Sequence, residues 1–282
     1  QAAIDESGYV FPKKRVIISL APSDKKKSGS HFDLAMAVGV LCQNGDIGVK
    51  KLPDYGFIGE LSLDGRLRAC RGILPMIIAG QKRGIKKIIV PEANFKEASL
   101  VHGVEILGFY DLIGVVRYLE GKTSGIEMHM EENEKILEES ERILDFKDVK
   151  GQDELIEAVV LAAAGGHNML MVGEPGCGKT MIAQRIPTIL PEMTEEECLE
   201  VTKIYSISGL LPNGHTLMKY RPFRAPHHNA SLNALIGGGA NAMPGEVSLA
   251  HNGVLFLDEL AEFSRRTLDA LRQPIEDKKV SI

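Results

Sequence analysis

Residues 169–180 read Met-Leu-Met-Val-Gly-Glu-Pro-Gly-Cys-Gly-Lys-Thr. Four apolar residues, a glycine-rich turn and a final Lys-Thr match the pattern GxxxxGK[ST], which requires a strand before the turn and a helix after it. Such a loop points backbone N–H groups at phosphates, and the following helix adds its positive end. We therefore predict a strand over residues 169–172 and a phosphate-binding loop. The predicted nucleotide-binding residues are Gly173, Glu174, Pro175, Gly176, Cys177, Gly178, Lys179, Thr180 and Met181.

A second segment carries carboxylates that suit the same chemistry. Residues 254–259 read Val-Leu-Phe-Leu-Asp-Glu and follow a turn at Asn252 and Gly253. A buried parallel strand would deliver both acids to the carboxyl edge of a sheet, where phosphates bind. Because this segment lies about 80 residues after the phosphate loop, the pair indicates nucleotide hydrolysis as well as binding.

Each polar residue of the two segments has an expected role. Lys179 neutralises charge on the β- and γ-phosphates, and we predict that Lys179 and Glu259 are the catalytic residues. The Thr180 hydroxyl is a hard oxygen ligand for Mg²⁺, and the Asp258 carboxylate would hold the same ion through water. Glu259 polarises the attacking water as general base. The expected cofactors are ATP and Mg²⁺.

The block between the two segments is rich in cationic groups and glycine. Arg221, Arg224, His227 and His228 precede a glycine run at 237–239. These side chains could make structural hydrogen bonds, or they could face nucleotide or substrate. A metal site is a third reading, although two adjacent histidines without further Cys/His spacing make a poor one. Residues 236–243 are expected to form a mobile loop.

The rest of the chain alternates strand-like and helix-like segments, which favours an α/β arrangement. We predict a helix over residues 153–164 that Asp153 caps. A Glu-rich stretch over 121–144 is expected to be a polar connecting helix. In the N-terminal part we predict strands at 15–20, 57–61 and 87–90, helices at 32–42 and 73–84, and a hairpin turn at 64–65.

Composition excludes several classes of protein. The 282 residues are 44% hydrophobic and 25% charged, which is incompatible with a disordered or collagen-like chain. The longest apolar stretch, 158–172, is broken by Gly-Gly-His-Asn, so no membrane span is expected. Four cysteines without metal spacing indicate reduced thiols, and no leader follows Gln1, so we expect a cytoplasmic protein.

Charge alone does not identify a partner. The net charge is −5, and the N-terminal part is only mildly basic, well short of a nucleic-acid footprint. Basic runs at 13–15 and 25–27 are either solvated loops or a DNA-contacting surface. In the second case, binding would weaken steeply with salt.

The motifs together resemble a known family. Residues 173–180, the block RPFRAPHHNASLNALIGGGANAMPGEVSLAHNG from Arg221, and FLDELAEFSRRTLDALRQPIED from Phe256 resemble the magnesium-chelatase-like AAA+ family, and within it the ComM/YifB proteins. The resemblance implies an AAA+ P-loop NTPase core with a parallel sheet over 145–282. It also implies a linker over 121–144 and a Lon-protease-like α+β domain over 1–120. In this clade, inserts near residues 236–243 often line the pore of a ring.

The Lon-like resemblance rests on residues 59–75 and 84–91 and does not extend to proteolysis. A Ser-Lys protease needs a lysine beside its serine. Where the protease has that lysine, this chain has Gly72-Ile73-Leu74, and Ser30 has no base in its own segment. The domain is therefore expected to be a catalytically inactive scaffold that lacks its first strands.

The resemblance implies an ATP-driven motor, a hexameric ring that acts on DNA in branch migration or as a helicase. Two alternatives remain: a motor subunit for inserting Mg²⁺ into a porphyrin, and a non-catalytic nucleotide-dependent binding module. Family members continue past Walker B, the segment that ends at Asp258 and Glu259, with a sensor, an arginine finger and a helical lid. Because the chain ends at Ile282, we expect the 282 residues alone to have very low ATPase activity.

Overall fold

The computed structural model describes residues 1–21, 29–123, 144–211, 217–239 and 242–280. The chain divides into two compact units, Gln1–Met130 and Glu131–Ile282. Each unit is described separately below.

The N-terminal unit is built on a three-stranded parallel sheet. Its order is β1 (Tyr55–Phe57), β4 (Lys87–Pro91) and β5 (Glu105–Phe109). β4 is central and pairs Phe57 with Ile89 on one side and Ile89 with Leu107 on the other. Central parallel strands are buried on both faces, and this explains why four of the five β4 residues are buried.

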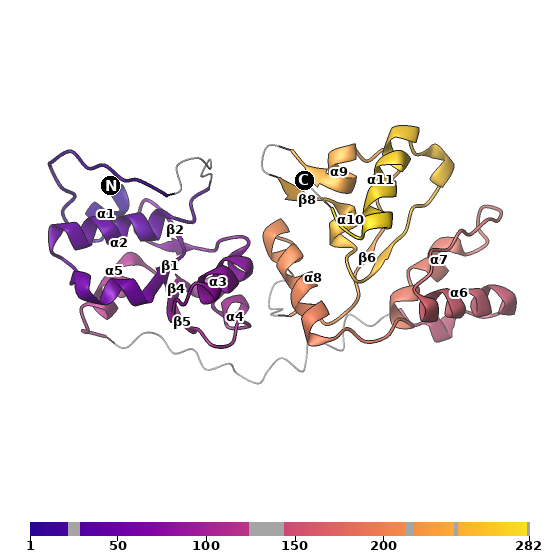
Figure 1. The fold of residues 1–282 in the computed structure, drawn as a ribbon, viewed down its shortest axis with the longest axis horizontal. Coiled ribbons are helices and arrows are strands. Elements are labelled where there is room, and N and C mark those ends of the chain that lie inside the picture. Colours follow the sequence, from indigo (N-terminus) through magenta and orange to yellow (C-terminus); the bar gives the residue numbers. More distant parts are fainter. Residues whose placement is uncertain (22–28, 124–143, 212–216, 240–241, 281–282) are drawn as a thin grey trace. The chain divides into compact units, whose positions relative to one another are not determined.

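Helices cover both faces of this sheet (Figure 1). Ile89, Leu107 and Phe109 contact α2 and α5 in one buried cluster. The opposite face meets α3 and α4, where Gly108 lies so close to Phe95 that a Cβ there would approach its ring to 3.1 Å. The helices of this unit are α1 (Ala2–Glu6), α2 (Asp33–Asn44), α3 (Ile73–Lys82), α4 (Phe95–Ala98) and α5 (Leu112–Leu119), with 3-10 turns at Val49–Asp54 and Glu92–Asn94.

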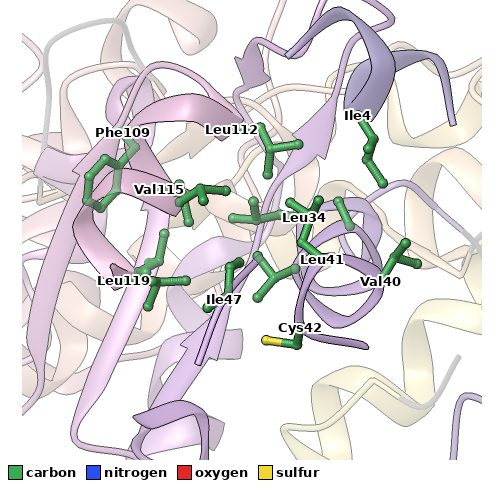
Figure 2. Close-up of a cluster of buried hydrophobic side chains, with 14 of the residues drawn as sticks. Ile4, Leu34, Val40, Leu41, Cys42, Ile47, Phe109, Leu112, Val115 and Leu119 are labelled. Carbon is green, nitrogen blue, oxygen red and sulfur yellow. The ribbon is translucent and has the colours of Figure 1, made fainter. Parts of the chain in front are cut away.

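The core of the unit is a cluster of buried hydrophobic side chains (Figure 2). Leu34 and Leu41 of α2 and Leu112 and Val115 of α5 have no exposed surface. Asp111 caps α5 by accepting a 2.7 Å hydrogen bond from the Gly114 N–H, which satisfies one of the free donors of the first turn.

Most sequence predictions for this unit are confirmed. The helices at 32–42 and 73–84 are α2 and α3, and the strand at 87–90 is β4. The hairpin is also present, since β2 (Glu60–Leu61) pairs antiparallel with β3 (Leu67–Arg68). The strand at 15–20 is wrong: that segment has no regular structure, and Ile17 is 77% exposed. A β-branched run alone cannot form a strand without a partner for its backbone.

The second unit carries the motifs of the sequence analysis. Its only strand pairs in the described residues are short: β6 (Phe223–Arg224) parallel to β9 (Val254–Leu255), and β7 (Gly237–Gly238) antiparallel to β8 (Met243–Pro244). Its helices are α6 (Asp153–Gly165), α7 (Lys179–Ala183), α8 (Glu195–Ser208), α9 (Leu232–Ile236), α10 (Glu246–Leu249) and α11 (Arg265–Asp277), with 3-10 turns at Phe146–Asp148, Ile186–Thr188 and Leu260–Glu262.

Two predictions for the second unit are wrong. Residues 169–172 form no strand, and Leu170 and Val172 are 72% and 90% exposed, because no described segment supplies a hydrogen-bonding partner. Asp153 does not cap α6; the N-cap is Gln152 in a left-handed conformation. The described part of residues 236–243 belongs to α9 and to the β7–β8 hairpin, and the mobility of this segment stays a prediction.

Two predictions lie largely or wholly outside the described residues. They are the connecting helix, of which 124–143 is not described, and the basic run at 25–27. Among the helices that are described, none combines the length and the apolar character needed to cross a bilayer.

Candidate nucleotide-binding site

The glycine-rich loop begins at Gly173 and leads into α7 (Figure 1). Gly176 and Gly178 have φ angles of +82° and +89°, and Gly178 is the N-cap of α7. Only glycine adopts this left-handed region without strain, which explains both positions in physical terms. Gly173 lies against the Cys177 side chain, and a Cβ would come within 2.9 Å of its sulfur.

Lys179 folds back over this loop. Its Nζ donates hydrogen bonds to the carbonyl oxygens of Gly173 and Glu174, at 2.8 and 2.9 Å, and lies 3.5 Å from Cys177 Sγ. The ammonium group is therefore held above the loop by the backbone of the loop itself.

The structure brings Thr180 and Asp258 together. Thr180 Oγ1 donates a 3.1 Å hydrogen bond to Asp258 Oδ2, although the two residues are 78 positions apart. Asp258 follows β9, whose pairing with β6 places it there. That pairing needs Gly253, since a Cβ at this position would lie 2.1 Å from the Pro222 carbonyl oxygen.

Asp258 and Glu259 border one open pocket. The pocket has a volume of about 300 Å³, and its wall comes from α7, from the segment after β6 and from the segment after β9. Its lining residues are Thr180, Ala225, Pro226, His227, His228, Phe256, Asp258 and Glu259. Parallel strands end at the same edge of a sheet, so the residues after β6 and after β9 meet here. Gly173–Cys177 and Lys179 do not line the pocket.

Glu259 reaches the pocket through an unusual backbone. Its φ and ψ are +51° and +49°, a left-handed conformation that is uncommon outside glycine. Its N–H donates to Asp258 Oδ1 at 2.9 Å. Its carboxylate Oε2 lies 3.1 Å from His228 Nδ1.

The two arginines of the intervening block make structural contacts. Arg224 forms a bidentate ion pair with Glu246, which raises the pKa of its guanidinium. Arg221 donates to the carbonyl oxygens of Pro191 and Asn252 and contacts Glu197 at 3.3 Å. Of the four cationic groups that the sequence singled out, only the two histidines border the pocket.

The donor set fits a magnesium ion that also takes phosphate oxygens. Thr180 and Asp258 offer two hard oxygen atoms 3.1 Å apart, and Mg²⁺ commonly uses one or two protein ligands with substrate phosphates. No group of three His, Cys, Asp or Glu side chains in the described ranges could hold a metal by itself. The metal-binding reading of His227 and His228 therefore gains no support.

Sequence reasoning missed two features of the site. The first is the apolar part of the wall, Ala225, Pro226 and Phe256. The second is the pairing of His228 with Glu259. A partial signal was available, because His228 comes shortly after a segment, 223–226, that could run parallel to 254–257 and end at the same edge.

In the N-terminal unit, Ser30 donates a hydrogen bond to the Glu60 carboxylate. His31 Nε2 lies 3.0 Å from the Arg71 carbonyl oxygen. The absence of proteolytic activity remains a prediction.

Known proteins share these motifs. The family described as "Magnesium chelatase, subunit ChlI" matches residues 145–282, and the family described as "Subunit ChlI of Mg-chelatase" matches residues 1–94. The uncharacterized protein YifB of Escherichia coli K12 is 45% identical over 287 residues, covering 100% of this chain and 54% of YifB. The competence protein ComM of Haemophilus influenzae is 41% identical over 283 residues, covering 100% of this chain and 55% of ComM. The chain belongs to the magnesium-chelatase-like ComM/YifB family.

This ComM/YifB-family chain spans about half the length of the curated relatives it matches. It also has a weaker likeness to the archaeal Lon protease of Methanocaldococcus jannaschii, at 30% identity over 94 residues, which is 33% of this chain and 14% of that protein. Membership of this family supports the interpretation of the chain as an AAA+-type ATPase. The structure itself mixes helices and strands and includes parallel strand pairs.

Proposed function

We propose that this protein binds and hydrolyses Mg-ATP and that it is the AAA+ part of a ring motor acting on DNA. The observation that carries the proposal is the 3.1 Å contact between Thr180 and Asp258. It joins Thr180, which follows the glycine-rich loop, to the acidic segment after β9, as a shared magnesium and phosphate site requires.

The proposed roles of the loop residues follow from their chemistry. The backbone of residues 173–181 surrounds the phosphates with N–H donors. Lys179 exchanges its hydrogen bonds to the Gly173 and Glu174 carbonyl oxygens for phosphate oxygens. In this way the ammonium group neutralises charge on the β- and γ-phosphates without a large movement.

The pocket residues supply the rest of the reaction. Thr180 and Asp258 hold Mg²⁺, which draws negative charge from the phosphate oxygens when bound. Glu259 accepts a proton from the attacking water as general base. Its side chain is 64% exposed, so water can reach the carboxylate.

The proposed DNA substrate rests on relatives. One of them is named a competence protein, and its identity to this chain extends over all 282 residues. The N-terminal unit is proposed to be a non-proteolytic Lon-like scaffold for assembly or substrate engagement. The proposed domains are 1–120 and 145–282, with a linker over 121–144. In this proposal the intact protein forms a hexameric ring.

A second candidate function is the motor of a magnesium chelatase. The description of the matching family favours it. The match to ComM argues for the DNA motor instead, because it covers the whole chain, including the 120-residue segment in front of the nucleotide-binding part. A non-catalytic nucleotide-dependent module is the third reading, and the set Lys179, Thr180, Asp258 and Glu259 argues against that one.

Two substitutions test the nucleotide chemistry in the full-length protein. Lys179→Ala should abolish binding of a fluorescent ATP analogue, because no other side chain of the loop carries a positive charge. Glu259→Gln should retain binding and lose about 10²–10⁴-fold in the hydrolysis rate, which is the usual contribution of a general base. Normal hydrolysis by Glu259→Gln would remove Glu259 from the proposed role.

The same assay distinguishes the substrates. Stimulation of ATP hydrolysis by branched DNA supports the proposed motor, and stimulation by a porphyrin-loaded partner supports the chelatase. Nucleotide binding with neither stimulation nor basal hydrolysis supports the binding module.

A further inference from the structure

A side chain from outside the glycine-rich loop holds one of the peptide groups of that loop. Gln152 Nε2 donates a 3.2 Å hydrogen bond to the carbonyl oxygen of Cys177. A peptide group is planar and trans, so its C=O and its N–H point in opposite directions. The bond therefore also fixes the direction of the Gly178 N–H, which points away from Gln152.

The backbone of Gln152 is in a conformation that favours glycine. Its φ and ψ are +57° and +47°. A longer residue persists there only where its surroundings hold it, and such outliers gather at functional sites. Gln152 takes the N-cap position of α6, which the sequence pattern gave to Asp153, and its side chain makes no hydrogen bond to the helix. Its amide bonds the loop instead.

Buried contacts fix Gln152 relative to the end of the loop. The segment before it contributes Phe146 and Val149 to a cluster in which Val159 of α6 and Ile182 of α7 are each 1% exposed. Since α7 follows the loop directly, this cluster joins the chain on both sides of the hydrogen bond. The two partners of the bond therefore meet in one arrangement.

We propose that Gln152 is a positioning residue for the glycine-rich loop: its amide holds the 177–178 peptide so that the Gly178 N–H faces the phosphates of a bound nucleotide. This inference deepens the proposed function and rests on it, because it assigns the group that sets the loop before the nucleotide arrives. Binding to a loop that already has its bound conformation avoids the free energy of ordering it. Gln152 thus lowers the Kd for ATP without contacting the nucleotide.

The role of Gln152 differs from that of Lys179. The ammonium group of Lys179 bonds the carbonyl oxygens of Gly173 and Glu174, and in the proposed function it exchanges them for phosphate oxygens. Gln152 has no charge and lies outside residues 173–180, so its bond to the loop persists when nucleotide binds. One peptide group of the loop then keeps the same orientation with and without nucleotide.

Two substitutions in the full-length protein remove the donor in different ways. Gln152→Met keeps an unbranched side chain of similar length but has no N–H. Gln152→Gly also removes the donor, and it relieves the left-handed strain of the backbone. We expect both variants to raise the Kd for Mg-ATP about 3- to 10-fold, the contribution of one ordinary hydrogen bond. A rise in Gln152→Met alone would assign the effect to the backbone and overturn the proposal.

Lys278 provides a matched control for the change of backbone. It is left-handed at φ +51° where α11 ends, and it is exposed. Lys278→Gly relieves the same kind of strain and should leave the Kd for Mg-ATP within twofold. A rise equal to that of Gln152→Gly would make glycine itself the cause and overturn the proposal. Thermal unfolding of each variant, recorded beside the binding, separates loss of fold from loss of positioning.

Steady-state kinetics separate positioning of the loop from the chemical step. The N–H groups of the loop bind phosphate in the ground state and in the transition state alike. Loss of such uniform binding raises KM and leaves kcat unchanged. We therefore expect KM for ATP to rise with Kd in both Gln152 variants and kcat to stay within twofold. A fall in kcat at constant KM would contradict the role of Gln152 in binding.

A comparison of two ligands shows where Gln152 acts. Inorganic triphosphate has the phosphates of ATP without its base or sugar. Positioning of the loop predicts that Gln152→Met weakens the binding of Mg-triphosphate and of Mg-ATP by the same factor. Weaker binding of Mg-ATP alone would mean that Gln152 contacts the nucleoside, and it would overturn the proposal.

The hydrogen bond also has a readout that needs no ligand. The ¹³C resonance of the Cys177 carbonyl should move upfield in Gln152→Met and in Gln152→Gly, because the carbonyl loses its donor, and stay in place in Lys278→Gly. An unmoved resonance in both Gln152 variants would show that the bond does not hold the loop, and it would overturn the proposal.

The binding measurements distinguish the failure of the two proposals. A wild-type protein that binds neither Mg-ATP nor Mg-triphosphate overturns the proposed function and the positioning role together. Wild-type binding without hydrolysis overturns only the proposed hydrolysis, because the Kd values still test Gln152. Equal Kd values for the wild type and Gln152→Met overturn the positioning role alone.

Discussion

Different kinds of contact stabilise the interior of each of the two units. In the N-terminal unit, helices cover both faces of a sheet, and Leu34, Ile89 and Leu112 have no exposed surface. In the second unit the buried clusters of the described residues are small. The polar contact of Thr180 with Asp258 lies at the pocket, and Arg224 pairs with Glu246 away from it. The described residues of the first unit thus form a larger buried apolar core, whereas in the second unit polar contacts join segments that are far apart in the sequence.

This difference has a consequence for ligands. Packed cores have one arrangement, because moving a buried side chain opens a cavity. Polar contacts between exposed loops are easily exchanged for contacts with a ligand. A nucleotide-binding site is therefore expected in the second unit, and substitutions in the two units should affect different measurements.

The largest expected effect is on the stability of the first unit. Leu34→Ala removes a side chain with no exposed surface from the core cluster. We expect the free energy of unfolding of the N-terminal unit, measured by chemical denaturation, to decrease by about 2–5 kcal/mol. ATP affinity should stay within twofold. A loss of affinity larger than that would break the comparison by showing that the units do not act independently.

Addition of Mg-ATP should act on the second unit alone. A ligand present at a hundredfold excess over its Kd stabilises the folded state by about 2.7 kcal/mol. Hydrogen exchange should therefore slow in the loop at 173–178 and near Asp258, and remain unchanged in β4. EDTA should reverse the effect if Thr180 and Asp258 hold the magnesium ion. Protection of β4 to the same extent would contradict the separation of the two units.

The smallest expected effect comes from one helix cap. Thr194 accepts a 3.2 Å hydrogen bond from the Glu197 N–H, and the Glu197 carboxylate accepts one from the Thr194 N–H in return. Thr194→Ala should lower the free energy of unfolding of the second unit by about 1 kcal/mol, measured by thermal unfolding. Thr194→Ser keeps the hydroxyl and serves as the control. Equal losses in the two variants would exclude the cap as the cause.

The local sequence pattern was sufficient to predict an element whose structure depends mainly on contacts within the element or on a strong turn signal. The helix α2, the buried strand β4 and the hairpin at Asp64 and Gly65 follow from the residues alone. The strands at 15–20 and 169–172 were wrong, since a strand exists only where another segment pairs with its backbone. The strand β5 and the helix α5 were not predicted, although the buried residues of α5, Leu112, Val115, Val116 and Leu119, have the i, i+3, i+4, i+7 spacing of a helix that packs on one face.

The sequence by itself determined the chemistry that this protein carries: the glycines at 176 and 178, the lysine and hydroxyl that follow, and the acids after β9. Residue types and short spacings are fixed along the chain, so they can be read directly. Tertiary structure decided which of these groups meet. It brought Thr180 to Asp258 and His228 to Glu259, and it paired Arg224 with Glu246, away from the pocket. Contacts between distant segments depend on how strands pair and loops close, and no local pattern encodes them.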